Sequence, residues 1–307
     1  MGKIAFVFPG QGAQAVGMGK DIFDALPQSR EVFEKADEVL GFPLSTLIFE
    51  GPESELKQTV NTQPALLTAS TAYLTALQGL GVKPDYVAGH SLGEYSALVA
   101  AGVLSYEDAV RLVRLRGRFM EEAVPGGSGA MAAVLGAERE ALAELCRNVS
   151  ETTGSVELAN VNCPGQIVVS GSREGVNSVV ERVKEAGGKR AIPLEVSGPF
   201  HSSLMKEAAD RLADELKKVT FHAPSVPVVV NVTAAPVTNP EEIRELLVRQ
   251  VYSPVLWQDS IEWLIADGVD TFVEIGSGSV LTGLIRKIDK SVKLININNL
   301  ESTQTAW

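Results

Sequence analysis

Short apolar runs alternate with amphipathic segments along most of the chain. Runs at residues 4–8, 86–88, 226–230, 271–274 and 292–295 predict buried strands, and the segments between them carry apolar residues at helical spacing. Strands that alternate with helices form a mainly parallel sheet that is covered on both faces. The pattern therefore predicts an α/β fold.

The pattern changes after the break at Pro125-Gly126-Gly127-Ser128-Gly129. Strand-like runs at 131–135, 156–161, 166–170 and 190–196 enclose helix-like segments at 138–148 and 173–186. This βαββαβ order is the ferredoxin-like arrangement. We therefore expect a ferredoxin-like subdomain at residues 125–197, inserted into a main domain formed by residues 1–124 and 198–307.

Composition narrows the classes of function. The net charge of −11 argues against non-specific binding to nucleic acid. Two cysteines, Cys146 and Cys163, are too few for a disulfide framework and lack metal-ligand spacing. No apolar run is long enough for a membrane span, and the first run ends at Pro9-Gly10, too early for a signal sequence. We expect a cytoplasmic protein without a nucleic-acid or membrane partner.

The pentapeptide Gly89-His90-Ser91-Leu92-Gly93 lies between a strand-like run and a helix-like run. It reads G-x-S-x-G, a turn that exposes the serine hydroxyl at the N-terminus of the following helix. The backbone N–H of Leu92, together with that of Gln11 in an N-terminal loop, can form an oxyanion hole. We predict a nucleophilic serine at Ser91; the alternative is a tight turn with a capping serine.

A serine nucleophile needs a base, and the chain has three histidines. His90 adjoins Ser91 on the turn and is expected to pack or hydrogen-bond locally, and His222 lies in a surface connection. His201 lies where the small subdomain returns to the main domain, and is the best candidate. The only aspartate between Ser91 and His201 is Asp108, in a capping-box pattern. We therefore expect a neutral group, such as a backbone carbonyl, to orient the histidine, which suits an activated thioester donor.

Arg116 is the second candidate for a functional residue. On a helical wheel, Arg111, Arg114 and Arg118 share a polar face, whereas Arg116 falls within the apolar face. A buried guanidinium needs a partner. Two explanations stay open: a structural ion pair with an internal carboxylate, or a fork for the carboxylate of a substrate.

Five motifs together resemble the malonyl-CoA:acyl carrier protein transacylase family, over nearly the whole chain. They are Phe8-Pro9-Gly10-Gln11-Gly12-Ala13-Gln14, Gly89-His90-Ser91-Leu92-Gly93-Glu94-Tyr95, Arg116-Gly117, Asn162-Cys163-Pro164-Gly165-Gln166 and Gly198-Pro199-Phe200-His201-Ser202. The resemblance implies an α/β-hydrolase-like core with a ferredoxin-like insertion.

The resemblance also implies a role for each candidate residue. Ser91 would be the nucleophile, His201 the base and Arg116 the group that holds the malonyl carboxylate. The oxyanion-hole amides would come from Gln11 and Leu92, and the main-chain carbonyl of Gln250 would orient the histidine.

The implied reaction is transfer of malonyl from malonyl-CoA to acyl carrier protein in fatty acid biosynthesis, by a monomer that needs no cofactor. Phe200 replaces a serine that is frequent in the family, and its bulk favours malonyl over methylmalonyl. Basic residues of the subdomain are candidates for carrier docking, although a merely solvated surface is equally open: Arg173, Arg182, Lys184, Lys189 and Arg190. Three alternatives remain: a malonyl-loading acyltransferase of a polyketide pathway, a serine thioesterase, or an inactive scaffold.

Overall fold

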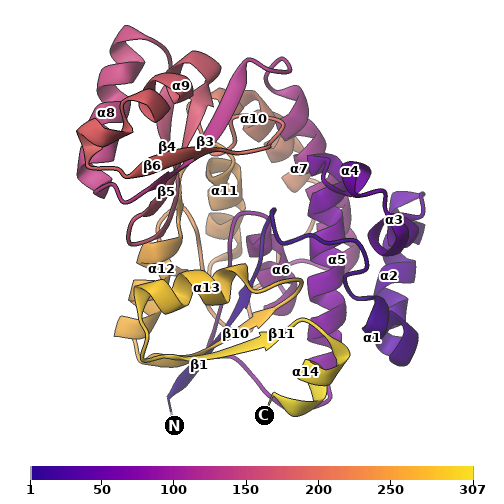
Figure 1. Ribbon diagram of the computed structural model, residues 1–307. Coiled ribbons are helices and arrows are strands. Elements are labelled where there is room, and N and C mark those ends of the chain that lie inside the picture. Colours follow the sequence, from indigo (N-terminus) through magenta and orange to yellow (C-terminus); the bar gives the residue numbers. More distant parts are fainter. Residues whose placement is uncertain (1, 307) are drawn as a thin grey trace.

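The computed structural model describes residues 2–306 and contains two β-sheets (Figure 1). The larger sheet carries strands from both ends of the chain and lies in the lower half of Figure 1. In sheet order its strands are β11 (Lys293–Ile297), β10 (Val269–Ile275), β1 (Lys3–Phe8), β2 (Tyr86–Gly89), β7 (Val228–Val229) and β8 (Pro236–Val237). Neighbours pair in parallel except β7 and β8, so the expected mainly parallel sheet is confirmed.

Both faces of this sheet are buried. Along β1, Phe6 and Phe8 belong to one apolar cluster, whereas Ala5 and Val7 belong to another on the opposite face. A strand whose side chains are buried on both faces reads as a continuous apolar run, which is why residues 4–8 contain no polar position.

Helices cover each face of the larger sheet. The first cluster includes residues from α1 (Lys20–Ala25), α2 (Pro27–Leu40), α3 (Leu44–Glu50), α4 (Glu53–Leu56), α5 (Thr59–Gln78), α6 (Gly93–Ala100), α7 (Tyr106–Glu122), α10 (Lys206–Leu216) and α11 (Pro240–Gln250). The second includes residues from α12 (Trp257–Ala266) and α13 (Val280–Ile288), and α14 (Leu300–Thr305) packs on α1 and α5. None of the helices within residues 2–306 has the length and apolarity needed to cross a membrane.

The smaller sheet forms the upper left of Figure 1. Its order is β6 (Arg190–Pro193), β3 (Gly129–Leu135), β5 (Gln166–Ser172), β4 (Val156–Cys163) and β9 (Val255–Leu256). Strands β3 to β6 pair antiparallel, and with α8 (Arg139–Thr152) and α9 (Arg173–Glu181) they show the βαββαβ order that the sequence predicts, around a separate apolar core. The fold class is therefore confirmed.

Strand β9 was not predicted from the sequence. It follows α11 and pairs in parallel with β4, so a segment from outside residues 125–197 completes the smaller sheet. The division into residues 1–124 with 198–307 and residues 125–197 stays a prediction.

Two helices have features that the apolar pattern does not show. Helix α5 begins at Thr59 and contains Pro64 in its second turn. The N–H groups of Asn61 and Thr62 already bond to the Gln58 carbonyl, so the first turn forms before the proline. The expected helix over residues 173–186 instead ends at Glu181 and is followed by the 3₁₀ turn η1 (Val183–Ala186).

Two further expectations are met only in part. The expected strand at 190–196 ends at Pro193, because the Val196 N–H turns back to the Leu194 carbonyl and the chain leaves the sheet. At the start of α7, Ser105 Oγ accepts from the Asp108 N–H, as a capping box requires. The Asp108 carboxylate, however, lies against Arg111 instead of returning to the Ser105 backbone.

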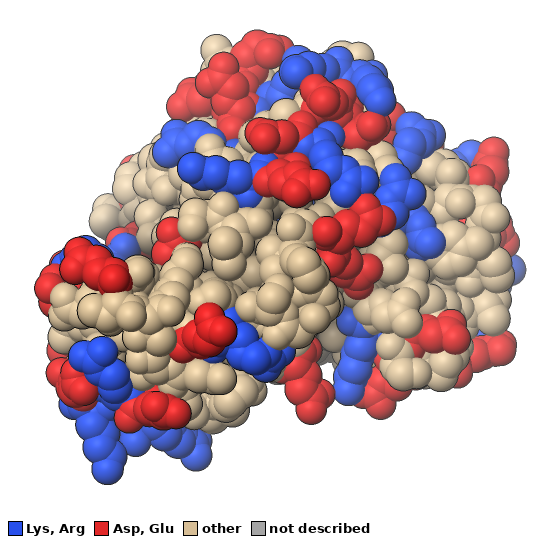
Figure 2. Space-filling model, turned by 90° about the horizontal axis from the view of Figure 1, so that it is seen from above, with Lys and Arg blue, Asp and Glu red and all other residues tan. Residues whose placement is uncertain are grey.

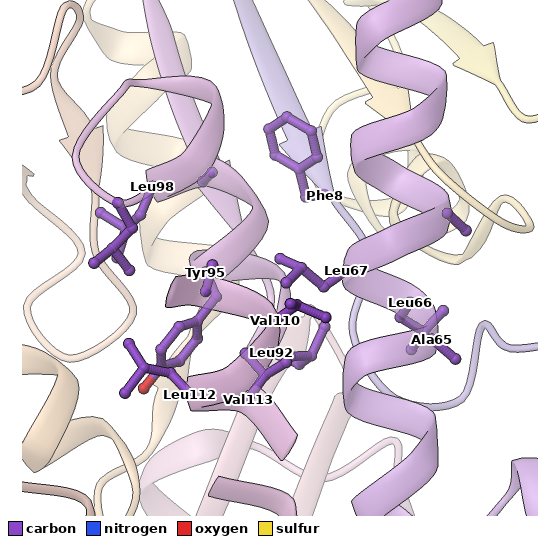
Figure 3. Packing of buried hydrophobic residues seen from close by; sticks show 14 of the residues in the cluster. Phe8, Ala65, Leu66, Leu67, Leu92, Tyr95, Leu98, Val110, Leu112 and Val113 are labelled. Carbon is purple, nitrogen blue, oxygen red and sulfur yellow. The ribbon is translucent and has the colours of Figure 1, made fainter. Parts of the chain in front are cut away.

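The helices behind β1 and β2 pack tightly around the serine turn. Figure 3 shows Leu67 of α5, Leu92 at the start of α6 and Val110 of α7 lying against one another. Tyr95 of α6 is also fully buried in this cluster. The turn that carries Ser91 therefore rests on a solid apolar base.

The glycines at the ends of the pentapeptide are required by this close packing. A Cβ on Gly93 would lie 2.1 Å from the carbonyl oxygen of Phe8, and a Cβ on Gly89 would lie 1.9 Å from the backbone of Gly93. No side chain fits at either position without moving β1 or α6.

Replacing Gly93 by alanine should destabilise the fold by about 1–3 kcal/mol, the usual cost of overpacking. Urea unfolding measures the change. Gly79→Ala is the control, because Gly79 has a helical φ of −69° and a Cβ there meets nothing within 4 Å. That variant should be as stable as the parent or slightly more stable. Equal stability of Gly93→Ala and the parent would contradict the contact with β1.

Candidate active site

Ser91 lies at the carboxyl end of β2, in the turn that begins α6. Its φ is 52°, in the left-handed region that a non-glycine residue adopts only when its surroundings hold it there. Asn231 supplies that support from the end of β7. Its Oδ1 accepts from the Ser91 N–H at 2.8 Å, and its Nδ2 donates to the Gly89 carbonyl at 2.7 Å. The turn is thus fixed from a neighbouring strand of the sheet.

His201 is the histidine that meets Ser91. Its Nε2 lies 2.7 Å from Ser91 Oγ, and its Nδ1 lies 2.8 Å from the carbonyl oxygen of Gln250. A carbonyl only accepts, so Nδ1 carries the proton and Nε2 is free to accept the serine proton. Burial, and secondly the charge of Arg116, lower the pKa of His201 to about 3. The imidazole is therefore neutral at neutral pH, as a general base must be.

Arg116 of α7 is only 1% exposed and points at the same serine. Its Nη1 donates to Gln63 Oε1 at 2.8 Å, and its Nη2 donates to Gln250 Oε1 at 3.0 Å and to Ser91 Oγ at 3.2 Å. Within residues 2–306 no carboxylate forms an ion pair with it, and its Nε has no hydrogen-bond partner. The structural ion pair that the sequence left open is therefore absent from the described residues. A buried cation surrounded by neutral acceptors is suited to an incoming anion.

Gln250 connects these groups. Besides its contacts with His201 and Arg116, its Nε2 donates to the Ser91 carbonyl at 3.0 Å and to Asn231 Oδ1 at 3.0 Å. Glu94 lies behind it, where its Oε2 accepts from the Asn231 N–H at 2.8 Å. Burial raises the pKa of Glu94 to about 7, although hydrogen bonds from Asn231 and Gln250 and the charge of Arg116 lower it in part.

Ser91 and His201 face a cavity of about 490 Å³ that lies between the two sheets. Gln11 and Leu92 both line it. Among the hydrogen bonds of residues 2–306, neither backbone N–H has a protein acceptor, so both are available to a ligand oxygen. Phe200 also lines the cavity, next to His201.

The structure brings all six candidate residues of the sequence together: Ser91, His201, Arg116, Gln11, Leu92 and Gln250. His90 and His222 take no part in the hydrogen bonds that connect Ser91, His201, Arg116 and Gln250. His222 is exposed, as expected. His90 packs against Trp257, as expected, and its hydrogen-bond partner is distant in sequence: its Nε2 lies 2.8 Å from Asn162 Oδ1 of β4.

Three buried polar residues of the site escaped the sequence analysis: Gln63, Glu94 and Asn231. Asn231 carried a usable signal, since it directly follows an apolar strand and ligand sites lie at the carboxyl ends of parallel strands. Gln63 and Glu94 lie within helical segments; Gln63 carried no signal, and Glu94 appeared only as part of a family motif. Across residues 2–306 no group of His, Cys, Asp and Glu side chains is placed to hold a metal ion.

Comparison with known proteins agrees with this geometry. The family model of the acyl transferase domain matches residues 5–303. The malonyl CoA-acyl carrier protein transacylase of Bacillus subtilis (strain 168) is 54% identical over 306 residues, which cover 100% of this chain and 96% of the relative. The enzyme of the same name from Staphylococcus aureus (strain MW2) is 49% identical over 99% of this chain and 98% of its own.

Solved structures give the same result. An acyl carrier protein S-malonyltransferase from Vibrio cholerae superposes with a TM-score of 0.96 at 46% identity, over 99% of this chain and 100% of its own. A malonyl-transacylase solved with a type II PKS acyl-carrier protein also has a TM-score of 0.96 at 46% identity, over 99% and 98% of the two chains. The chain therefore belongs to the acyl transferase family, and within it to the malonyl CoA-acyl carrier protein transacylases.

Proposed function

We propose that this acyltransferase moves a malonyl group from malonyl-CoA to the phosphopantetheine thiol of an acyl carrier protein, in fatty acid biosynthesis. A malonyl ester on Ser91 is the intermediate. One observation carries the proposal: Ser91 Oγ lies 2.7 Å from a base, His201 Nε2, and 3.2 Å from an arginine without a carboxylate partner among residues 2–306.

In the first half-reaction His201 takes the proton of Ser91 as Oγ attacks the thioester carbonyl. The N–H groups of Gln11 and Leu92 stabilise the oxyanion of the tetrahedral intermediate. Arg116 holds the malonyl carboxylate through charge-assisted hydrogen bonds. The C–S bond then breaks, and CoA leaves as a thiol with the proton from His201.

In the second half-reaction the carrier's thiol attacks the ester, again with His201 as the base, so the kinetics are ping-pong. The face of the molecule seen in Figure 2 carries interspersed basic and acidic side chains. Carrier proteins are usually acidic, so docking of a carrier requires a local basic surface. Lys184, Lys189 and Arg190 are exposed and, among the described residues, outside any ion pair. Arg182 is a weaker candidate because it pairs with Glu185 at 2.8 Å.

A serine thioesterase is the rival function, and one contact argues against it. Hydrolases on this scaffold orient the histidine with an acid, whereas His201 is oriented by the Gln250 carbonyl. Fatty acid and polyketide pathways are distinguished by which acyl carrier protein accepts the malonyl group from the enzyme. We further propose that the protein acts as a cytoplasmic monomer and binds no nucleic acid. It needs no cofactor of its own, because CoA and phosphopantetheine enter only as parts of its substrates.

Incubation with malonyl-CoA should add one malonyl group to the peptide that contains Ser91, as mass spectrometry can show. A holo acyl carrier protein should then remove it, and Ser91→Ala should never acquire it. In competition, malonyl should exceed methylmalonyl and acetyl, because Phe200 narrows the cavity and Arg116 needs a carboxylate. Absence of any adduct would exclude the proposed intermediate, and equal labelling by all three donors would exclude the selectivity.

Arg116→Ala should lower the rate of malonyl loading by about 100-fold, because it removes charge-assisted hydrogen bonds worth about 1.5–3 kcal/mol each. Acetyl loading should be unchanged or faster. Arg118→Ala is the matched control, since Arg118 is exposed on the same helix. Unchanged malonyl loading by Arg116→Ala would refute the carboxylate role.

The pH profile of kcat/KM should show no histidine limb near 6.5. The neutral imidazole is the active form, and the pKa of His201 is lowered from 6.5 to about 3, so the base is protonated only in strong acid. Activity should therefore persist to about pH 5 while circular dichroism shows a folded protein. A step that levels off below pH 7 would reflect Glu94. A tenfold fall per pH unit that begins near pH 6.5 would contradict the prediction.

A further inference from the structure

The nucleophile Ser91 is held by two groups at once. His201 Nδ1 carries a proton for the Gln250 carbonyl, so Nε2 is an acceptor and the Ser91 hydroxyl donates its proton to it. Arg116 only donates, so its Nη2–H occupies a lone pair of the same oxygen at 3.2 Å. In the empty site the guanidinium therefore occupies electron density on Ser91 Oγ that is needed for attack on the thioester carbon.

The same guanidinium opposes protonation of the base. Its charge is among the causes that lower the pKa of His201, after burial. The other titratable groups that face Arg116 or His201 are Glu94, Tyr95 and His90. Glu94 offsets the cation only in part, because burial raises its pKa to about 7 and leaves it partly protonated at neutral pH. Burial also keeps Tyr95 a neutral phenol and lowers the pKa of His90.

We propose that the carboxylate of the bound malonyl group activates the catalytic pair as well as anchoring the substrate. By pairing with Arg116 it draws the Nη2–H away from Ser91 Oγ and screens the guanidinium charge from His201. This inference rests on the proposed function and adds a role for the substrate's own charge. An acetyl group lacks the carboxylate. With acetyl bound, Arg116 therefore keeps its hydrogen bond to Ser91 Oγ, and its positive charge stays unscreened beside His201.

Proton transfer is the step that responds. The Ser91 proton moves to His201 Nε2 as the Oγ–C bond forms, and an imidazolium arises beside Arg116. With malonyl the carboxylate balances that second positive charge, and with acetyl nothing does. When the C–S bond breaks, the proton passes to the CoA sulfur and the imidazole is neutral again. Selection for malonyl thus acts on the rate of acylation as well as on binding.

Titration of His201 tests the inference without turnover. The Ser91→Ala protein, labelled with ¹³C at histidine Cε1, is titrated by NMR alone, with saturating malonyl-CoA and with saturating acetyl-CoA. The His201 signal is assigned by its loss in a Ser91→Ala, His201→Gln protein. Malonyl-CoA should raise the titration midpoint by about 1–3 pH units, the usual effect of an added opposite charge nearby. Acetyl-CoA should leave it in place.

Equal midpoints in the two complexes would overturn the inference. So would the lack of a rise with malonyl-CoA once binding is verified by calorimetry. These results are separable from failure of the proposed function, which shows as absence of a malonyl adduct on wild-type Ser91.

Single-turnover acylation gives a second test in the active enzyme. At saturating acetyl-CoA, Arg116→Ala should acylate several-fold faster than the wild type, because the cation no longer holds Ser91 Oγ or opposes His201. Arg118→Ala should match the wild type. If Arg116 served only to bind the malonyl carboxylate, acetyl transfer would be unchanged in Arg116→Ala, and that result would contradict activation by the substrate charge.

Discussion

The site depends on one residue, Gln250, which uses three of its groups at once. Its backbone carbonyl orients His201, its Oε1 holds Arg116, and its Nε2 holds the backbone of Ser91. The residue ends α11, and α11 packs into the cluster behind the larger sheet. The end of a single packed helix therefore contacts His201, Arg116 and Ser91 and helps to fix their relative positions.

This arrangement is costly for folding and useful for reaction. A buried guanidinium without an anion loses solvation that neutral acceptors restore only in part, and Arg116 Nε and Glu94 Oε1 have no hydrogen-bond partner within residues 2–306. The strained backbones of Ser91 and His201, with φ of 52° and 57°, add to that cost. Close packing of α5, α6 and α7 around the turn compensates for it. Preorganised polar groups of this kind are those that stabilise charge as it develops in a reaction.

The sequence predicted what is local and missed what is distant. The serine turn could be found because strand, turn and helix are consecutive, and Arg116 because a charge within an apolar helix face is visible on a helical wheel. The end of an apolar strand could mark Asn231 as a site residue, but its contact with Ser91 could not be predicted. The two residues lie 140 positions apart and meet only when β7 pairs with β2. The pairing of β9 with β4 and the contact of His90 with Asn162 were missed for the same reason. The main-chain role of Gln250 came from a family resemblance alone, since a backbone carbonyl leaves no mark in the residue type.

The neutral group behind His201 and the lack of a carboxylate partner for Arg116 among residues 2–306 have a common explanation. The two side chains meet at one serine oxygen, so a carboxylate placed to orient the histidine would lie close to the guanidinium as well. It would pair with Arg116, and the charge that the proposed substrate carboxylate needs would be lost inside the protein. A carbonyl orients the imidazole without that competition, and the amide oxygens of Gln63 and Gln250 hold the guanidinium without neutralising it. Under the proposed function, the neutral group behind His201 therefore leaves the buried Arg116 free to bind the carboxylate of the acyl group.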